Sequence, residues 1–290
     1  MPNRPRAARI STVSIVVPSD LSRGRPVEKA RNLALAARYL RRAGELGSDL
    51  VLLPEGFATK GLRATFTATR ASYATVCEPV PGGEIAELAA AAARRHRMYV
   101  VAPIIERDGA ALYNTAAVFD CRGYVVGKYR KMHLPPPGET AVFTPGGAAP
   151  VFDLDFGRVA IEICYDLNYP ELARMYALAG AEVLCWPTMW GDPADYQLAY
   201  MRGQAVANAV FFVGANYCQP GRKTGHPGQS AIIDPDGRVL ANTGNRPGVA
   251  SAVIDLDHRR LRERAKLHAG RRPALYRTLA TRTQNAGCGV

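Results

Sequence analysis

The segment from Arg158 to Leu172, RVAIEICYDLNYPEL, constrains the fold of this chain more than any other stretch. An apolar run ends at Cys164, a polar turn follows, and Pro170 opens a periodic apolar segment that continues to Ala181. This pattern predicts a buried strand, a sharp turn and a helix. Such a turn lifts a side chain off the end of a strand and directs backbone N–H groups toward the atom that it attacks. The segment therefore predicts a fold that presents a thiol as a nucleophile.

The rest of the chain alternates between short apolar runs and segments with helical spacing of apolar residues. The first pattern predicts strands and the second predicts helices. We expect strands at residues 10–17, 49–53, 98–106, 111–119, 121–128, 151–154, 182–187, 211–216, 229–233, 238–241 and 249–254. We expect helices at residues 26–46, 84–96, 170–181, 192–209 and 257–268. Residues 60–80 are irregular and rich in Thr and Ala, and we assign no element to them.

Length and composition limit how the chain can be organised. The 290 residues are 48% hydrophobic and 21% charged, which suffices for the core of one large domain and argues against disorder except at the ends. No linker and no internal repeat interrupts the sequence. We therefore expect a single domain over residues 1–290, with its core at about 10–268 and a basic C-terminal arm or tail at 269–290.

The cysteines do not suggest a disulfide framework or a zinc site. They stand at positions 77, 121, 164, 185, 218 and 288. No two of them form a CxxC pair or a Cys/His ligand spacing, so we expect no bound metal. A reducing cytoplasm suits this pattern best.

The N-terminus resembles a signal peptide at first sight, because basic residues precede an apolar stretch. Ser11, Thr12 and Ser14 interrupt that stretch, and Pro18 and Asp20 stand where a small-residue cleavage site would be. We therefore expect a first strand rather than a secretion signal. No apolar run approaches the roughly 20 residues of a membrane helix, so we expect no membrane association.

The net charge of +12 raises the possibility of nucleic-acid binding. The arginines, however, are dispersed through the expected helices at 26–46, 84–96 and 257–268. Solvated helix faces account for such a distribution. We expect no nucleic-acid partner, and we retain binding through the basic surface and tail as an alternative.

Two further side chains could assist the thiol of Cys164. Glu55 follows a buried strand directly, and Lys131 lies in a cationic run before a proline-rich loop. A free thiol is only a few per cent ionised near neutrality, so a nucleophilic cysteine needs a base and a cation. Glu55 can accept the proton, and Lys131 can stabilise the thiolate and the oxyanion formed on a carbonyl or nitrile carbon. A core cysteine, a solvated glutamate and a solvated charge run are the alternatives for residues taken singly.

Three sequence blocks together resemble a known family. PEGF at 54–57, KYRKMHLP at 128–135 and CYDLNYPE at 164–171 look like the signature blocks of the nitrilase (carbon–nitrogen hydrolase) superfamily. The resemblance extends roughly from Ile10 to His268. One block alone is weak, but three blocks in this order and at this spacing are highly specific.

The resemblance implies a fold, a catalytic triad and an assembly. The fold would be an α/β four-layer αββα sandwich that packs as an αββα–αββα dimer or a higher homo-oligomer. Glu55 would be the general base and acid, Lys131 the transition-state stabiliser and Cys164 the nucleophile. The backbone N–H of Tyr165 would share the oxyanion with Lys131. Glu139, eight residues after the lysine, would be a second active-site glutamate. No metal or organic cofactor is implied.

The residues after the cysteine bear on the substrate. True nitrilases usually have Trp-Glu there, whereas this chain has Tyr165 and Asp166, which favours a small-molecule amide over a nitrile. The expected reaction is hydrolysis of an amide to a carboxylic acid and ammonia through a thioester. Phe57, Trp190 and Tyr165 are candidate pocket residues, with a core or surface role equally open for each.

Several alternatives stay open at this point. The acyl group of the substrate is undecided. N-carbamoyl hydrolysis and nitrile hydrolysis are the alternatives within enzymes, and a catalytically inactive binding homologue is the alternative outside them.

Overall fold

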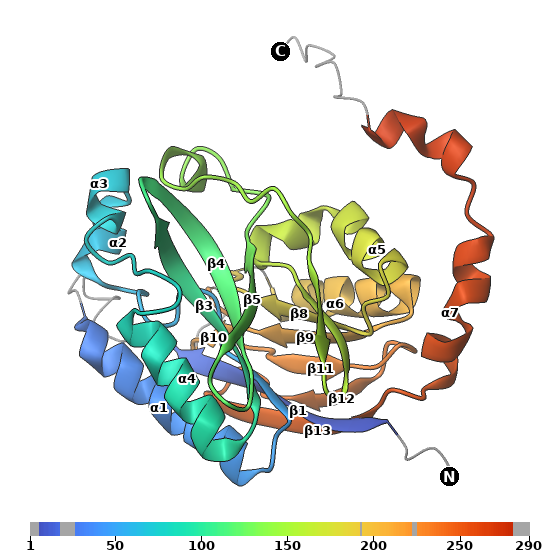
Figure 1. Cartoon of the computed structure of the whole chain (residues 1–290), viewed down its shortest axis with the longest axis horizontal. Helices are drawn as coiled ribbons and strands as arrows, with labels where there is room; N and C mark the ends of the chain where they lie inside the picture. The colour runs from blue at the N-terminus through green and yellow to red at the C-terminus, as the bar shows by residue number, and fades with distance from the viewer. Residues whose placement is uncertain (1–5, 18–26, 192, 222–224, 281–290) are drawn as a thin grey trace.

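Two sheets pack face to face, and helices cover their outer sides (Figure 1). The computed structural model describes residues 6–17, 27–191, 193–221 and 225–280. The predicted four-layer αββα arrangement is therefore the architecture of this chain. The dimer of such sandwiches stays a prediction.

The first sheet has the strand order β10-β1-β2-β3-β4-β5, and β13 also pairs with β1. β1, β2 and β3 run parallel, whereas β3, β4 and β5 form antiparallel hairpins. Its strands are β1 (Ala7–Val16), β2 (Leu50–Leu52), β3 (Tyr99–Asp108), β4 (Ala111–Phe119), β5 (Val125–Arg130), β10 (Tyr217–Cys218) and β13 (Gly248–Asp255).

The second sheet has the strand order β12-β11-β9-β8-β7-β6. β7, β8 and β9 run parallel in its centre, and antiparallel strands flank them. Its strands are β6 (Val151–Leu154), β7 (Gly157–Ile161), β8 (Val183–Pro187), β9 (Phe211–Ala215), β11 (Ala231–Ile233) and β12 (Val239–Asn242). The central strands read as unbroken apolar runs because helices or the other sheet cover both of their faces.

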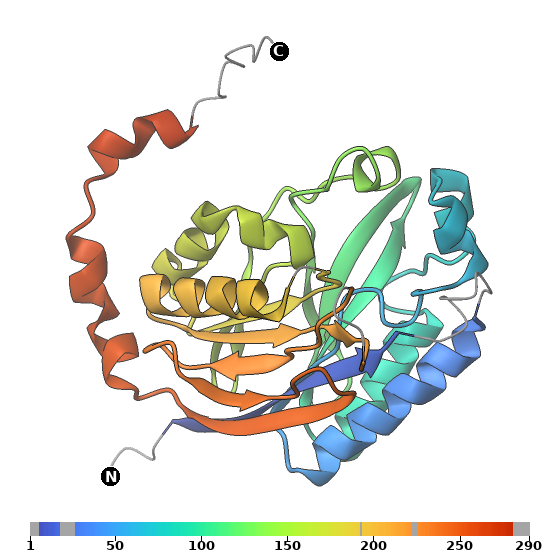
Figure 2. The ribbon, with the colours of Figure 1, turned by 180° about the vertical axis from the view of Figure 1, so that it is seen from behind.

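Amphipathic helices form the two outer layers. α1 (Lys29–Glu45) and α4 (Glu84–His96) cover the first sheet, and α4 turns a stripe of alanines toward β3. α5 (Pro170–Leu178) and α6 (Ala194–Asn208) cover the second sheet, as seen from behind in Figure 2. α7 (Arg259–Ala269) and a 3-10 segment at Pro273–Ala280 run along the side of the sandwich as an arm.

Residues 60–80, which carried no expected element, contain two short helices. α2 spans Arg63–Thr67 and α3 spans Arg70–Tyr73. Helices this short show no apolar period, and α3 depends instead on a capping box, in which Thr69 accepts a hydrogen bond from the backbone N–H of Ser72. The stretch without an assigned element is therefore partly helical and otherwise irregular.

Two expectations fall partly outside the described residues. Asp192, the expected cap of α6, is outside them, and the helix begins at Ala194 with Pro193 as the preceding residue. Residues 281–290 of the expected tail are also outside them. Within the described residues, no helix combines the length and apolar character needed to cross a membrane.

Candidate active site

The expected catalytic residues follow the ends of strands in both sheets. Glu55 lies three residues beyond β2, and Lys131 comes directly after β5. Glu139 begins a short 3-10 turn in the loop after Lys131, and Cys164 begins another beyond β7. β2 and β5 belong to the first sheet and β7 to the second, and side-chain contacts join the segments that follow these strands.

Lys131 is buried between two carboxyl groups. Its Nζ lies 3.0 Å from Oε1 of Glu55 and 2.8 Å from Oε1 of Glu139. Asn114, in the middle of β4, donates from Nδ2 to Oε1 of Glu55 at 2.8 Å. The hydroxyl of Tyr217 also donates to the backbone carbonyl of Glu55, at 3.1 Å. These contacts hold the Glu55 carboxylate in one orientation.

Electrostatics keep Lys131 charged. Burial alone would lower the pKa of Lys131, but attraction to Glu55, Cys164 and Glu139 more than offsets it, so the pKa is raised. Burial and the nearby charge of Glu55 raise the pKa of Glu139, and its contact with Lys131 offsets only part of that effect. The cluster therefore combines a permanent cation with a glutamate that holds a proton more readily than usual.

Cys164 occupies a left-handed backbone conformation with φ of 46°. Such a conformation is costly for a residue with a side chain, and it is found where the surrounding structure enforces a sharp turn. Trp186 donates from Nε1 to the carbonyl of Cys164 at 2.9 Å and so fastens the turn to β8. The sequence expectation of a thiol at a sharp strand–turn junction matches this geometry.

The buried carboxylate of Asp166 braces the same turn. It accepts hydrogen bonds from the backbone N–H of Ile163 at 2.8 Å and from the hydroxyl of Tyr129 at 2.7 Å. It also accepts from the backbone N–H and from Nδ1 of His133, at 3.0 and 2.8 Å. Asp166 thus joins the Cys164 turn to the segment that carries Lys131.

The thiol of Cys164 does not ionise by itself at neutral pH. Burial and the charge of Glu55 raise its pKa to about 12, although Lys131 partly offsets this increase. Thr188 and the backbone of Met189 also lower the pKa of the thiol, but they do not cancel the increase. A base must therefore remove the proton as the sulfur reacts, and Glu55 is close enough for its charge to act on the thiol.

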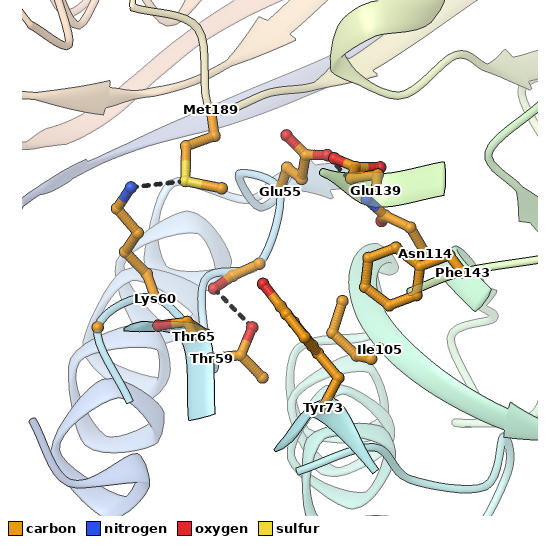
Figure 3. A pocket seen from close by; sticks show the side chains of 12 residues that line it. Glu55, Thr59, Lys60, Thr65, Tyr73, Ile105, Asn114, Glu139, Phe143 and Met189 are labelled. Atoms are coloured by element: carbon orange, nitrogen blue, oxygen red, sulfur yellow. Dashed lines mark hydrogen bonds between the residues drawn. The ribbon is translucent and has the colours of Figure 1, made fainter. Parts of the chain in front are cut away.

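A cavity of about 290 Å³ opens beside this cluster (Figure 3). Its wall combines the carboxyl groups of the cluster with hydroxyl, amine and apolar side chains. The lining residues are Glu55, Gly56, Thr59, Lys60, Gly61, Thr65, Tyr73, Ile105, Asn114, Glu139, Phe143 and Met189. The volume is at the low end for a ligand pocket, so the site suits a small molecule.

The three candidate pocket residues are not among the residues that line this cavity, and neither are Lys131 and Cys164, so their role as pocket residues stays a prediction. Phe57 is buried in the core between the first sheet and its helices. Trp190 packs against Trp186, with ring centroids 5.5 Å apart, and Tyr165 meets Tyr169 edge to face.

Sequence reasoning missed Asn114, Lys60, Thr65 and Tyr73 in the cavity wall. An asparagine inside the apolar run of β4 was a usable signal, because a buried amide needs partners. Lys60, Thr65 and Tyr73 belong to the stretch that carried no expected element, so no pattern pointed to them.

Among the described residues, one group is close enough together to hold a metal ion, and it consists of Asp234, Asp236 and His258. Oδ1 of Asp234 accepts the backbone N–H groups of Asp236 and Arg238 at 2.9 and 2.8 Å, which is a turn-forming role. None of these residues belongs to the catalytic cluster.

Comparisons with known proteins agree with this geometry. The model of the family described as Carbon-nitrogen hydrolase matches residues 13–263. Omega-amidase NIT2-A of Xenopus laevis is 34% identical over 262 residues, which cover 86% of this chain and 92% of the relative. A nitrilase of Pyrococcus abyssi is 36% identical over 234 residues, which cover 79% of this chain and 86% of the relative.

Among solved structures, a mutant of the amidase from Nesterenkonia sp. AN1 superimposes with a TM-score of 0.73 at 25% identity. The match covers 96% of this chain and 98% of that one. That structure shows covalent addition of the acetamide moiety of fluoroacetamide at its active site cysteine.

Proposed function

The chain belongs to the carbon–nitrogen hydrolase family, and from this membership we propose that it hydrolyses a small amide to a carboxylic acid and ammonia through a thioester on Cys164. The observation that carries this proposal is the contact of Lys131 with Glu55 and Glu139 beside the strained turn of Cys164. These groups supply a base, a cation and a nucleophile at one site.

Acylation begins as Glu55 takes the proton of the Cys164 thiol and the sulfur bonds to the amide carbon. The electron pair of the carbonyl bond moves to oxygen, and the resulting oxyanion is stabilised by the ammonium of Lys131 and the backbone N–H of Tyr165. When the carbonyl bond re-forms, the carbon–nitrogen bond breaks and Glu55 returns the proton to the leaving nitrogen. Ammonia departs and a thioester remains.

Deacylation uses the same base a second time. Glu55 takes a proton from a water molecule while the oxygen of that water bonds to the thioester carbon. Lys131 again stabilises the oxyanion. The carbon–sulfur bond then breaks, Glu55 returns the proton to the sulfur, and the acid leaves. One amide and one water thus give one acid and one ammonia.

Glu139 has a supporting part in this scheme. Its Oε1 accepts a hydrogen bond from Nζ of Lys131 at 2.8 Å, while Oε2 is buried without a hydrogen-bond partner among the described residues. Because burial raises its pKa, Glu139 can carry a proton there and donate a hydrogen bond to a substrate oxygen or nitrogen.

Amide hydrolysis is favoured over the alternatives by the relatives. The omega-amidase is named for amide hydrolysis, and the Nesterenkonia amidase carries an amide-derived group on its cysteine. The Pyrococcus relative is named a nitrilase, so nitriles and N-carbamoyl compounds remain comparison substrates in the test. We also propose that one catalytic domain covers residues 10–268 and assembles as a homodimer through the helices after Cys164.

The test is an ammonia-release screen over short amides, N-carbamoyl acids and nitriles. It compares the wild type with Cys164→Ala and with Lys266→Met, a control on an exposed face of α7. We expect short amides to be the best substrates, turnover to vanish in Cys164→Ala, and the control to match the wild type. Amide hydrolysis that survives in Cys164→Ala would overturn the proposal.

A further inference from the structure

Lys60 is a partly buried lysine that the catalytic scheme does not use. It follows the turn after Glu55 and lines the cavity with Thr65 and Tyr73. In Figure 3 its amine and the carboxyl group of Glu139 lie at opposite sides of the view, with Glu55 between them. A small molecule in the cavity can therefore reach this amine as well as the catalytic cluster.

Lys60 differs from the other lysines of the described residues because it has no carboxylate partner there. Ion pairs join Lys29 to Glu78 and Glu84, Lys128 to Glu106, Lys131 to Glu55 and Glu139, and Lys266 to Glu263. Burial without a counterion lowers the pKa of Lys60, and the more distant charges of Glu55 and Cys164 do not restore it. The amine of Lys60 is thus neutral, and so nucleophilic, more often than that of an exposed lysine.

The neighbours of the Lys60 amine also suit its neutral form. Nζ lies 2.7 Å from Sδ of Met189, which is a weak acceptor, and 5.7 Å from the ring centroid of Tyr217. It lies 3.5 Å from Nε2 of His226, whose pKa is lowered by burial. Nδ1 of His226 lies 3.0 Å from the carbonyl of Trp190, so the hydrogen-bond network assigns the ring proton to Nδ1. Nε2 is then free to accept a proton from the amine.

We propose that Lys60 is a covalent modification site, at which a short, uncharged aldehyde forms an imine and blocks the cavity. An imine requires a neutral amine that a carbonyl compound can reach, and Lys60 meets both requirements. The volume of about 290 Å³ and the apolar side chains of Ile105 and Phe143 suit a short carbon chain. Imine formation does not depend on the proposed function, and only its inhibition of amide hydrolysis rests on it.

The reaction joins one amine and one aldehyde and releases one water. The lone pair of Nζ bonds to the carbonyl carbon, the electron pair of the carbonyl bond moves to oxygen, and Nε2 of His226 relays a proton from nitrogen to that oxygen. The carbon–oxygen bond then breaks as nitrogen forms a double bond to carbon. The hydroxyl group leaves as water with the remaining proton of the nitrogen. The hydroxyl of Tyr73 points into the cavity in Figure 3, and burial raises its pKa, so it is a neutral donor that can relay this proton.

A rival target for an aldehyde is the thiol of Cys164, which would add to the carbonyl carbon and give a hemithioacetal. That adduct contains no carbon–nitrogen double bond for cyanoborohydride to reduce, and it dissociates when the aldehyde is removed. An imine on Lys60 is instead reduced to a secondary amine that persists. Reductive trapping therefore separates the two targets.

The experiment treats the intact protein with butanal and sodium cyanoborohydride, removes both by gel filtration and locates butyl groups on lysines by peptide mass spectrometry. It compares the wild type with Cys164→Ala, Lys60→Arg and the surface control Lys266→Met. We expect butylation of Lys60 to be faster than that of Lys266 by about tenfold or more, because near neutral pH the neutral fraction rises by that factor for each unit by which the pKa falls. Cys164→Ala and Lys266→Met should retain the label at Lys60.

Amide turnover of the wild type after gel filtration should fall in step with the butylation of Lys60. Lys60→Arg, whose guanidinium forms no imine, should keep its own initial turnover under the same treatment. Three results would overturn the inference: butylation of Lys60 no faster than that of Lys266, loss of the label in Cys164→Ala, or full turnover in wild type that is labelled at Lys60.

An untreated wild type that hydrolyses no amide would refute the proposed function alone, because the label at Lys60 is measured without turnover. Unfolding curves of each variant verify that it is folded.

Discussion

A lysine buried between two glutamates is the residue on which the site depends. Lys131 has no exposed side-chain surface, and it contacts Glu55 and Glu139 at 3.0 and 2.8 Å. Desolvating such a cation costs several kcal/mol, and only close, well-oriented partners offset that cost. The same contacts fix the position of the Glu55 carboxylate, so the proposed catalysis and the stability depend on the same atoms.

Replacement of Lys131 by Met should lower both the stability of the protein and its rate of amide hydrolysis. The two carboxyl groups would remain buried without a cation, which costs about 3–5 kcal/mol. Loss of the oxyanion partner should reduce kcat by about a hundredfold or more. Urea unfolding and amide turnover measure the two effects. A variant that is inactive but as stable as the wild type would contradict the buried ion cluster.

Glu162 is a buried carboxyl group that the reaction does not use. Both of its oxygens lack a hydrogen-bond partner within the described residues. Burial, with a smaller contribution from the charge of Asp166, raises its pKa to about 8. In the unfolded chain a glutamate releases its proton near pH 4.3. Between these values the folded state holds a proton that the unfolded state has lost, so rising pH favours unfolding.

Glu162→Gln should therefore stabilise the protein relative to the wild type more at pH 8 than at pH 5. The difference should grow by up to about 1.4 kcal/mol per pH unit inside that window. Thermal unfolding from pH 5 to 9 measures it, with Glu45→Gln as a control at an exposed position of α1. A difference between Glu162→Gln and the wild type that stays constant with pH would refute the assignment.

At the level of elements, a short turn begins at Cys164 and positions the proposed nucleophile. The left-handed backbone at Cys164 persists because Asp166 accepts four hydrogen bonds from three residues around it. An asparagine amide cannot replace the Asp166 carboxylate well, because its NH₂ group would face N–H and O–H donors instead of accepting from them.

Asp166→Asn should lower kcat by about tenfold or more and reduce stability by about 1–3 kcal/mol. Turnover and urea unfolding measure these effects, and the alkylation rate of Cys164 by iodoacetamide reports on the turn itself. Asp153→Asn, at an exposed position of β6, is the matched control. Wild-type kinetics and alkylation in Asp166→Asn would show that the carboxylate does not hold the turn.

The elements also show what the sequence could and could not predict. The strand at 98–106 could be predicted because its apolar run is long, and the helix at 84–96 because its apolar residues recur over several helical turns. α2 and α3 were missed because helices of four or five residues have no period and depend on caps and tertiary contacts. The cavity wall was missed with them, since Lys60, Thr65 and Tyr73 lie there.

The proposed catalytic residues stand out in the sequence more clearly than the residues that line the cavity. Glu55, Lys131 and Cys164 lie at the ends of recognisable strands, whereas Phe57 and Trp190 are aromatic residues that could equally fill a core, and they do. Which aromatic residue faces a cavity depends on side-chain packing that no single-sequence pattern reports.

At the scale of the whole molecule, the helical layer over the second sheet exposes apolar side chains to solvent. α5 and α6 expose apolar side chains, including Met175, Leu178 and Val206. Tyr200, Ala199 and Gly203 line a shallow apolar depression on the same layer. Exposed apolar patches of this kind mark association surfaces, and the common symmetric solution is a dimer.

Met175→Asp should therefore weaken self-association. We expect the wild type to elute as a dimer or a larger oligomer in size-exclusion chromatography with light scattering, and the variant to dissociate at low micromolar concentration. Tyr124→Asp, at an exposed turn before β5, should behave as the wild type. A wild type that is monomeric at all concentrations would contradict the proposed assembly.

The most direct test of the central claim measures how the acyl group divides between water and hydroxylamine. An amide and the methyl ester of the same acid are hydrolysed in parallel with hydroxylamine present, and the acid and hydroxamate are quantified. If both substrates form one thioester on Cys164, the ratio of acid to hydroxamate, corrected for the reaction without enzyme, must be the same for both, and Cys164→Ala must give neither product above the enzyme-free rate. Different corrected ratios for the two substrates, or hydroxamate formed by Cys164→Ala above the enzyme-free rate, would contradict the thioester mechanism.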